Sequence, residues 1–143
     1  MGCEMIGIHL KTMSNLIKKK IDFLSKDVEL TGFQSYLLGY LIHESEQRDI
    51  FQRDVERHLE ISRASVTNIL QLLEKNGFIR REAVSYDARL KKIAVTEKGY
   101  AANKKIIDIL KYVDSSLQTD VTKEEMEVFM TVLEKMKKNL ERT

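Results

Sequence analysis

Apolar residues recur along the chain at spacings of three and four, the period of one face of an α-helix. In the first segment, residues 4–27, they predict a helix with a stripe on one side and a second apolar strip on another. Apolar surface on two sides of one helix favours burial against more than one partner, such as another subunit. The stripe consists of Ile6, Leu10, Met13, Ile17, Ile21 and Leu24, and the second strip of Leu16 and Phe23.

Three further helices are predicted over residues 31–45, 51–59 and 63–76. Thr31 and Gln34 have the spacing of a capping box at the start of the first, and Ser62 is a good N-cap for the third. Asn76-Gly77 supplies a stop, since both residue types tolerate positive φ. The apolar face expected for residues 31–45 consists of Phe33, Tyr36, Leu37, Tyr40 and Leu41, and that for residues 63–76 of Val66, Ile69, Leu70 and Leu73.

A hairpin and two long helices complete the predicted order of elements. Phe78–Val84 and Lys91–Val95 are each short enough to be strands, and a polar connector, Ser85–Leu90, joins them. Thr96 caps a helix over about 97–117, and Thr122 with Glu125 forms a second capping box before a helix that runs to about 141. The fold class is therefore mainly α with a small β-hairpin. The residues expected to point inward from the last helix are Met126, Phe129, Met130, Leu133, Met136 and Leu140.

Length and composition limit the class of protein. A chain of 143 residues with 43% apolar and 32% charged residues suits a single folded domain. Cys3 is the only cysteine, which excludes an internal disulfide framework and a Cys-rich zinc module. The sequence shows no apolar run of membrane-spanning length and no secretory signal, so we expect a cytoplasmic protein without a membrane partner.

The positive charge is concentrated in the middle of the chain. Residues 47–92 carry ten basic and seven acidic side chains, whereas the whole chain has a net charge of only +2. A local basic patch can hold phosphates even on a nearly neutral protein, although a solvated charged face is the simpler interpretation. Five cations lie within thirteen residues, namely Arg80, Arg81, Arg89, Lys91 and Lys92.

A short helix, a three-residue turn and a second helix over residues 51–76 form a helix-turn-helix pattern. A helix that enters the DNA major groove needs short or hydrogen-bonding side chains on its exposed face. The candidate DNA-contacting residues of the second helix are Ser62, Arg63, Ala64, Ser65, Thr67, Asn68 and Gln71. The alternatives are an ordinary surface helix in a bundle, or a winged helix that binds another protein instead of DNA.

A hairpin directly behind a recognition helix is a wing. Arg89 at its tip can enter a narrow minor groove, and Lys91 follows it. Asp87 is close enough in sequence to hydrogen-bond Arg89 or the loop backbone and so to fix the direction of the arginine. The alternative is a plain exposed turn with scattered charges.

These segments resemble the multiple-antibiotic-resistance regulator (MarR) family. The run Ile61–Arg81 is similar to the family's recognition helix and first wing strand, Asp87–Lys91 to its wing motif, and Val95–Gly99 to the signature before its fifth helix. The resemblance extends over about 4–141. It implies one subunit over 1–143, with a winged helix-turn-helix region over 31–98 and a dimerisation region over 4–27 and 99–141.

The resemblance also implies a function. It predicts a homodimer that binds double-stranded DNA at a pseudo-palindromic operator, in most members as a repressor, and that a small aromatic or anionic ligand releases. Some positions depart from the family's pattern. Phe51 stands where a Ser or Thr usually caps a helix, Gly32 where Pro is common, and Ala88 where a basic residue is frequent. Glu56 stands at a usually small position, so its carboxylate must reach solvent or a basic partner.

Three hypotheses compete for a regulatory signal. Tyr36, Tyr40, His43 and Phe51 could line a ligand pocket, although aromatic residues at helical spacing are more often core. Cys3 could sense oxidants, although a frayed, exposed thiol at the N-terminus is the simpler interpretation. No metal site is predicted, because His9, His43 and His58 have no second histidine at helical spacing.

Enzyme chemistry has no support in the sequence. We find no phosphate-binding Gly-rich loop, no Cys/His pair at a useful spacing and no clustered carboxylate pair, and we therefore expect neither catalysis nor a cofactor.

Overall fold

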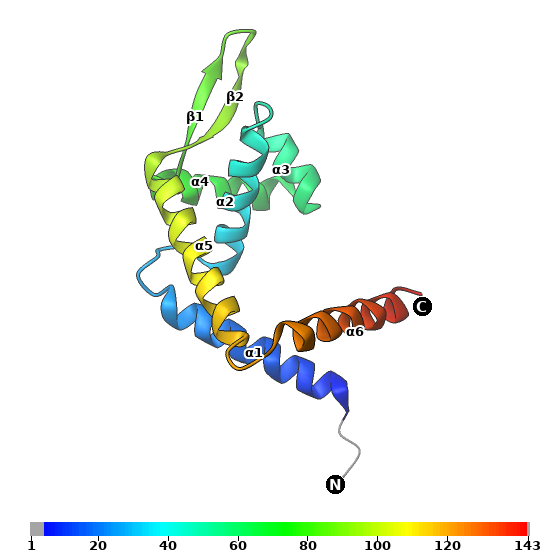
Figure 1. Cartoon of the computed structure of the whole chain (residues 1–143). Helices are drawn as coiled ribbons and strands as arrows, with labels where there is room; N and C mark the ends of the chain where they lie inside the picture. Colours follow the sequence, from blue (N-terminus) through cyan, green and yellow to red (C-terminus); the bar gives the residue numbers. More distant parts are fainter. Residues whose placement is uncertain (1–4, 143) are drawn as a thin grey trace. The chain divides into compact units, whose positions relative to one another are not determined.

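The computed structural model describes residues 5–142, which form six helices and two strands (Figure 1). In chain order these are α1 (Ile6–Leu24), α2 (Gly32–Ser45), α3 (Gln52–Leu59), α4 (Arg63–Lys75), β1 (Ile79–Val84), β2 (Asp87–Val95), α5 (Glu97–Leu117) and α6 (Lys123–Glu141). The chain divides into two compact units, one over residues 22–108 and the other formed by the residues before and after that range. The mainly helical fold with a two-stranded hairpin confirms the predicted fold class.

The unit over residues 22–108 contains a continuous apolar core. Leu37, Leu38 and Leu41 of α2 are buried in it, together with residues from α3, α4, both strands and the start of α5. From α4 the predicted residues Val66, Leu70 and Leu73 are fully buried, and Ile69 packs against the same core. The other fully or nearly fully buried members are Ile50, Val55, Phe78, Ile79, Ile93, Val95 and Ala102.

The apolar face predicted for α2 was partly wrong. Phe33 and Tyr36 are exposed, whereas Leu38, which the prediction left out, is completely buried. Because α2 carries apolar residues on several sides, helical spacing alone does not identify the side that meets the core.

The helix starts agree with the predictions. The hydroxyl of Thr31 accepts the Gln34 N–H at 3.1 Å, and the Gln34 side chain accepts the Thr31 N–H at 3.0 Å. Thr122 and Glu125 form the same reciprocal pair, and Ser62 accepts the Ser65 N–H. Each side-chain cap satisfies an N–H group that the first helical turn leaves without a backbone partner.

The wing is longer than predicted. β1 and β2 pair antiparallel from Ile79 opposite Val95 to Val84 opposite Asp87, with a bulge at Ala83 and Val84. The connector is only Ser85–Tyr86, so the predicted connector Ser85–Leu90 was wrong. The prediction took polar residues as loop, but a projecting hairpin exposes much of both faces, and its backbone pairing does not require apolar side chains.

In the unit formed by the two ends of the chain, α1 and α6 contain no buried residue. Phe129, Met130 and Leu140 were predicted to point inward, but they are 50%, 46% and 77% exposed in the single chain. Met126, Leu133 and Met136 are half-buried. A single copy of the chain therefore leaves much of the apolar surface of these helices in contact with solvent.

In the described range, no helix combines the length and the apolar character that crossing a bilayer requires.

Two glycines shape the connection from α4 to the wing and from the wing to α5. Gly77 has a φ of +82°, and it donates its N–H to Glu74 while Phe78 donates to Leu73, the Schellman pattern of a helix end. Gly99, near the start of α5, lies against Phe78 and Val95. A Cβ atom there would clash with the carbonyl oxygen of Phe78 and lie 2.6 Å from the Val95 side chain.

We predict that Gly99→Ala lowers the free energy of unfolding by about 1–3 kcal/mol, because the methyl group forces backbone to move in a packed junction. Urea titration followed by circular dichroism measures this effect. Gly32→Ala is the matched control, since a Cβ at Gly32 meets no atom within 4 Å. A Gly99→Ala protein as stable as the Gly32→Ala protein would contradict the close approach of Gly99 to Phe78 and Val95.

Candidate nucleic-acid interface

α3 and α4 form a helix-turn-helix in which the turn is Glu60–Ser62. Glu60 has a left-handed backbone, with φ 54° and ψ 37°, and its N–H donates to the carbonyl of Glu56. This conformation ends α3 within one residue, and Ser62 then caps α4. The turn therefore has the three residues that the sequence predicted.

Most predicted DNA-contacting residues of α4 lie on its outer face. Val66, Leu70 and Leu73 point into the core, and the exposed side carries mainly small and polar residues, although Leu72 is also 44% exposed. The exposed members of the predicted set are Ser62, Arg63, Ala64, Ser65, Asn68 and Gln71, whereas Thr67 is half-buried. Apart from the long, exposed side chain of Arg63, the exposed residues that precede Asn68 on this face are small, so the first turns of α4 can approach another surface closely.

Two predicted residues of α4 are held by neighbours inside the motif. The Gln52 amide donates to the Thr67 hydroxyl at 2.8 Å. The Arg63 guanidinium lies 3.4 Å from a Glu56 carboxylate oxygen, although its side chain remains 83% exposed. The expectation that Glu56 reaches a basic partner is thus confirmed.

Phe51, where the family pattern has a capping hydroxyl, still precedes a well-formed helix. Its own N–H donates to the Asp54 carboxylate at 2.8 Å, which supplies half of a capping box. Its ring is buried, so the residue contributes to the core as well as to the start of α3.

On the wing, Asp87 holds Arg89 by three contacts. The Arg89 N–H donates to the Asp87 carboxylate at 2.9 Å, and two guanidinium nitrogens lie 3.3 and 3.4 Å from its oxygens. The backbone bond, and next the side-chain bonds, hold the pKa of Asp87 below its ordinary value. The Arg89 side chain is 91% exposed. Arg89 lies in β2 and not in the turn, but its predicted orientation by Asp87 is confirmed.

The remaining cations of the wing are partly neutralised. Arg80 pairs with Glu82, and this hydrogen bond lowers the pKa of Glu82. Lys92 lies 3.7 Å from Asp49 and 3.8 Å from Glu82. Lys91 is exposed. The local excess of positive charge seen in the sequence is therefore smaller at the surface of the wing than the count of cations suggests.

Sequence reasoning missed several polar residues beside the motif. Arg81 of β1 donates to the Gln52 side-chain oxygen at 3.3 Å, which connects the wing to α3. Tyr86, at the wing turn, donates to Asp49 at 3.4 Å, and burial followed by the charge of Asp49 raises the pKa of Tyr86. These two contacts join residues 29 and 37 positions apart, so no local feature of the sequence indicates them.

The four residues predicted to line a ligand pocket have different surroundings. The Tyr40 ring stacks on His58 with centroids 3.9 Å apart, and the Tyr36 hydroxyl lies 2.7 Å from His58 Nε2. Burial, and next the charge of Glu44, raises the pKa of Tyr40. His43 is exposed and Phe51 is buried. A pocket formed by these four residues stays a prediction.

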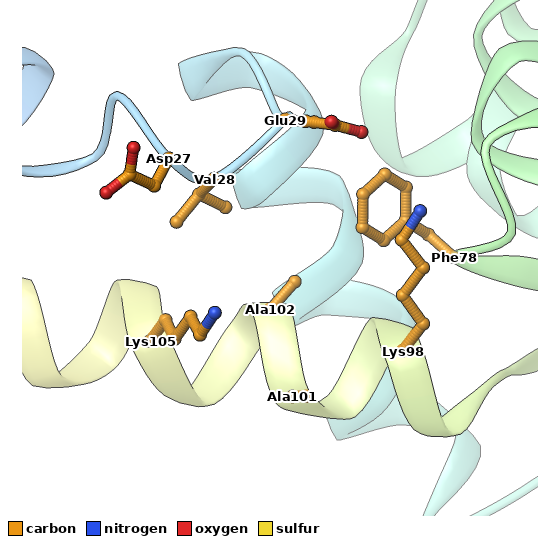
Figure 2. A pocket seen from close by; sticks show the side chains of 8 residues that line it. All are labelled: Asp27, Val28, Glu29, Phe78, Lys98, Ala101, Ala102 and Lys105. Carbon is orange, nitrogen blue, oxygen red and sulfur yellow. The ribbon is translucent and has the colours of Figure 1, made fainter.

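A shallow pocket of about 270 Å³ lies elsewhere in the unit over residues 22–108 (Figure 2). Val28, Phe78 and Ala102 contribute apolar surface. Lys98 lies over the Phe78 ring, 4.6 Å from its centroid. Asp27 and Glu29, from the loop before α2, lie across the pocket from Lys98 and Lys105 of α5 (Figure 2). The lining residues are Asp27, Val28, Glu29, Phe78, Lys98, Ala101, Ala102 and Lys105, which include none of the four predicted above.

The other regulatory hypotheses find no added support. Cys3 lies outside the described residues, so its predicted redox role stays a prediction. Among residues 5–142, no group of three or more His, Cys, Asp and Glu residues is arranged to hold a metal ion.

Comparison with known proteins agrees with this geometry. The model of the MarR family matches residues 27–90. The uncharacterised HTH-type transcriptional regulator YybA of Bacillus subtilis (strain 168) is 32% identical to this chain. The alignment covers 96% of this chain and 85% of that protein.

Two solved structures of S. aureus MepR are similar over nearly the whole chain. The MepR–DNA complex has a TM-score of 0.80 at 27% identity and covers 91% of this chain and 96% of that one. MepR bound to ethidium bromide has a TM-score of 0.77 at 26% identity, and the match covers 96% of this chain and 97% of that one. The family match, the similarity to YybA over most of both chains and the similarity to MepR together show that the chain belongs to the MarR family of DNA-binding transcriptional regulators.

Proposed function

We propose that this regulator is a repressor that acts as a homodimer in the cytoplasm on a pseudo-palindromic operator. The observation that carries the proposal is the outer face of α4: its amino-terminal turns expose small or hydrogen-bonding side chains, while its inner face is buried in the core. A major groove about 12 Å wide admits an α-helix, and short or hydrogen-bonding side chains at its leading end allow close approach to the base edges. The MepR–DNA complex, similar over 91% of this chain, supports the same use of the fold.

The proposed contacts divide between bases and phosphates. Asn68 and Gln71 are exposed amides, which suit the adenine edge, and Arg63 suits guanine once it leaves Glu56.

Ser62 and Ser65 lie at the amino end of α4, where hydroxyls and backbone N–H groups suit a phosphate. Ala64 allows close approach, and Thr67 and Lys91 complete the proposed set.

On the wing, Arg89 is proposed to enter the minor groove beside each half-site. Asp87 restrains its guanidinium while leaving most of it exposed, so the side chain loses less freedom when it binds. A narrow, A·T-rich minor groove has the strong negative potential that attracts arginine. A winged helix that binds a protein would not need an arginine prepared in this way, which places the protein-binding alternative second.

Dimerisation is proposed to use α1, α6 and the end of α5. Leu16, Phe129 and Leu140 are at least half exposed in the single chain, and no residue of α1 or α6 is buried. A second copy offers the same apolar surface, and a two-fold axis would let each copy cover the other. Two copies would also present two α4 helices, as a pseudo-palindrome requires.

Release by a small aromatic or anionic effector is the last part of the proposal. MepR, whose similar structure contains ethidium, shows that a relative accepts an aromatic compound. Two places in this chain are candidates: the neighbourhood of Tyr36, Tyr40, His43 and Phe51, and the pocket at Phe78 (Figure 2). Binding in either place would act next to elements that position α4 or the wing.

We predict that Arg89→Ala weakens binding to operator DNA by about 1–3 kcal/mol and reduces the salt dependence by about one ion for each subunit. Fluorescence anisotropy at several salt concentrations measures both. Lys104→Ala is the matched control, because it removes one positive charge from α5, outside the wing. Equal affinities for the two variants would contradict the role of the wing and favour a protein partner.

We predict that Met13→Glu converts a dimer into a monomer of 16.6 kDa and abolishes tight operator binding. Met13 is an exposed member of the apolar stripe of α1, and a charge there would be buried without a partner in the dimer. Sedimentation velocity gives the mass. Asn15→Glu introduces the same charge on the opposite side of α1 and should leave the dimer intact. A dimeric Met13→Glu protein would argue against this interface.

We predict that ethidium or a phenolic acid raises the Tm and weakens operator binding in the same concentration range. Ala101→Leu partly fills the pocket of Figure 2 and should abolish the response if the effector binds there, whereas Tyr36→Phe should alter it if the other place is used. If no compound of this panel stabilises the protein or changes DNA binding, release by an effector of this class is contradicted.

A further inference from the structure

The side chain of Gln52, in α3, contacts both α4 and β1, the first strand of the wing. Gln52 is the first residue of α3, and its half-buried amide lies between α4 and β1. The amide nitrogen donates to Thr67 of α4 at 2.8 Å and lies 3.3 Å from the Glu56 carboxylate. The amide oxygen accepts from Arg81 of β1 at 3.3 Å. The recognition helix and the wing are thus connected through one residue.

The partners of Gln52 determine the orientation of its amide. A carboxylate only accepts hydrogen bonds and a guanidinium only donates them, so the nitrogen must face Glu56 and the oxygen must face Arg81. Both ends of the amide are therefore used, and no other side chain of this length supplies two N–H donors together with an oxygen acceptor. Thr67 completes the arrangement as an acceptor for the second N–H.

The connection continues to the exposed end of α4. Glu56, which accepts from Gln52, also pairs with Arg63 at 3.4 Å. We call Gln52, Glu56, Arg63, Thr67 and Arg81 the Gln52 network. Two of its members, Arg63 and Thr67, belong to the set proposed to contact DNA, while Arg81 lies on the first strand of the wing.

We propose that Gln52 is a positioning residue for sequence recognition: it fixes the side chains of Thr67 and Arg63 and sets the orientation of the wing relative to α4. The inference rests on the proposed function. Gln52 acts through Thr67, Glu56 and Arg81, so its contribution is to specificity more than to the attraction of phosphates. Removing it would free the side chains of Thr67 and Arg63 and let β1 shift at Arg81 relative to α4, which its buried residues keep in place. Bases that depend on this alignment would be distinguished less well.

Gln52→Met tests this role, because methionine has nearly the same length and helix propensity but neither donates nor accepts in the network. The measurement compares Kd for the operator, selected on the unmodified protein, with Kd for a duplex altered at one base read by α4. We expect the ratio of the two Kd values to fall about tenfold, while affinity for unrelated DNA changes less than twofold. Gln47→Met is the matched control on an exposed glutamine.

Two further variants separate positioning from simple support of the fold. Gln52→Glu still accepts from Arg81 and from the Thr67 hydroxyl, so it should keep more specificity than Gln52→Met despite a second carboxylate beside Glu56. Gln52→Ala removes the network with no added bulk and replaces Gln52→Met if that protein does not fold. In addition, Arg81→Met should reduce the Kd ratio strongly in the unmodified protein and weakly when Gln52 is already replaced.

The inference is overturned if folded Gln52→Met or Gln52→Ala keeps the Kd ratio of the unmodified protein, or if the effects of Gln52 and Arg81 on that ratio are additive. An unmodified protein that binds no duplex selectively would instead overturn the proposed function, so the two failures are distinguishable.

Discussion

The anchoring of α4 by Val66, Leu70 and Leu73 is the constraint on which the rest of the structure depends. These side chains are fully buried against α2, α3 and the strands, so α4 cannot rotate about its axis without exposing them. Rotation would cost the burial of several large apolar groups, each worth about 1.5–3 kcal/mol. The polar outer face of α4 is therefore presented in one orientation only, and a regulator that reads DNA requires this.

Hydrogen bonds at the end of α4 and the start of α5 also hold the base of the wing in place. The Schellman ending at Gly77 directs the chain into β1, and the Thr96 hydroxyl contacts the carbonyl of Gly77 while accepting the Gly99 N–H. Ile93 of β2 also donates to the carbonyl of Ile50, which joins the wing to the linker before α3. The base of the wing is thus fixed at several points, whereas its charged outer part is held by ion pairs that an incoming phosphate can replace.

Local features of the sequence predicted more of this structure than long-range ones did. Helix caps at Thr31, Ser62 and Thr122 depend on residues three positions apart, and a reader of the sequence finds them directly. The contact of Asp87 with Arg89 was predictable for the same reason. The contacts of Gln52 with Thr67 and Arg81 join residues 15 or more positions apart, and the buried side of α2 and the full length of β2 depend on the surface that the rest of the fold presents. Periodicity carries no information about those.

The most direct test of the account is selection of random duplex DNA on the purified protein, with binding of the recovered sequences repeated at two salt concentrations. We predict an enriched pseudo-palindrome whose half-site centres lie about one helical turn, roughly 10 base pairs, apart. Selective binding should persist at the higher salt. Recovery of no common sequence, with weak binding that disappears as salt rises, would mean contact with phosphates alone and would contradict a dimer that reads DNA through α4.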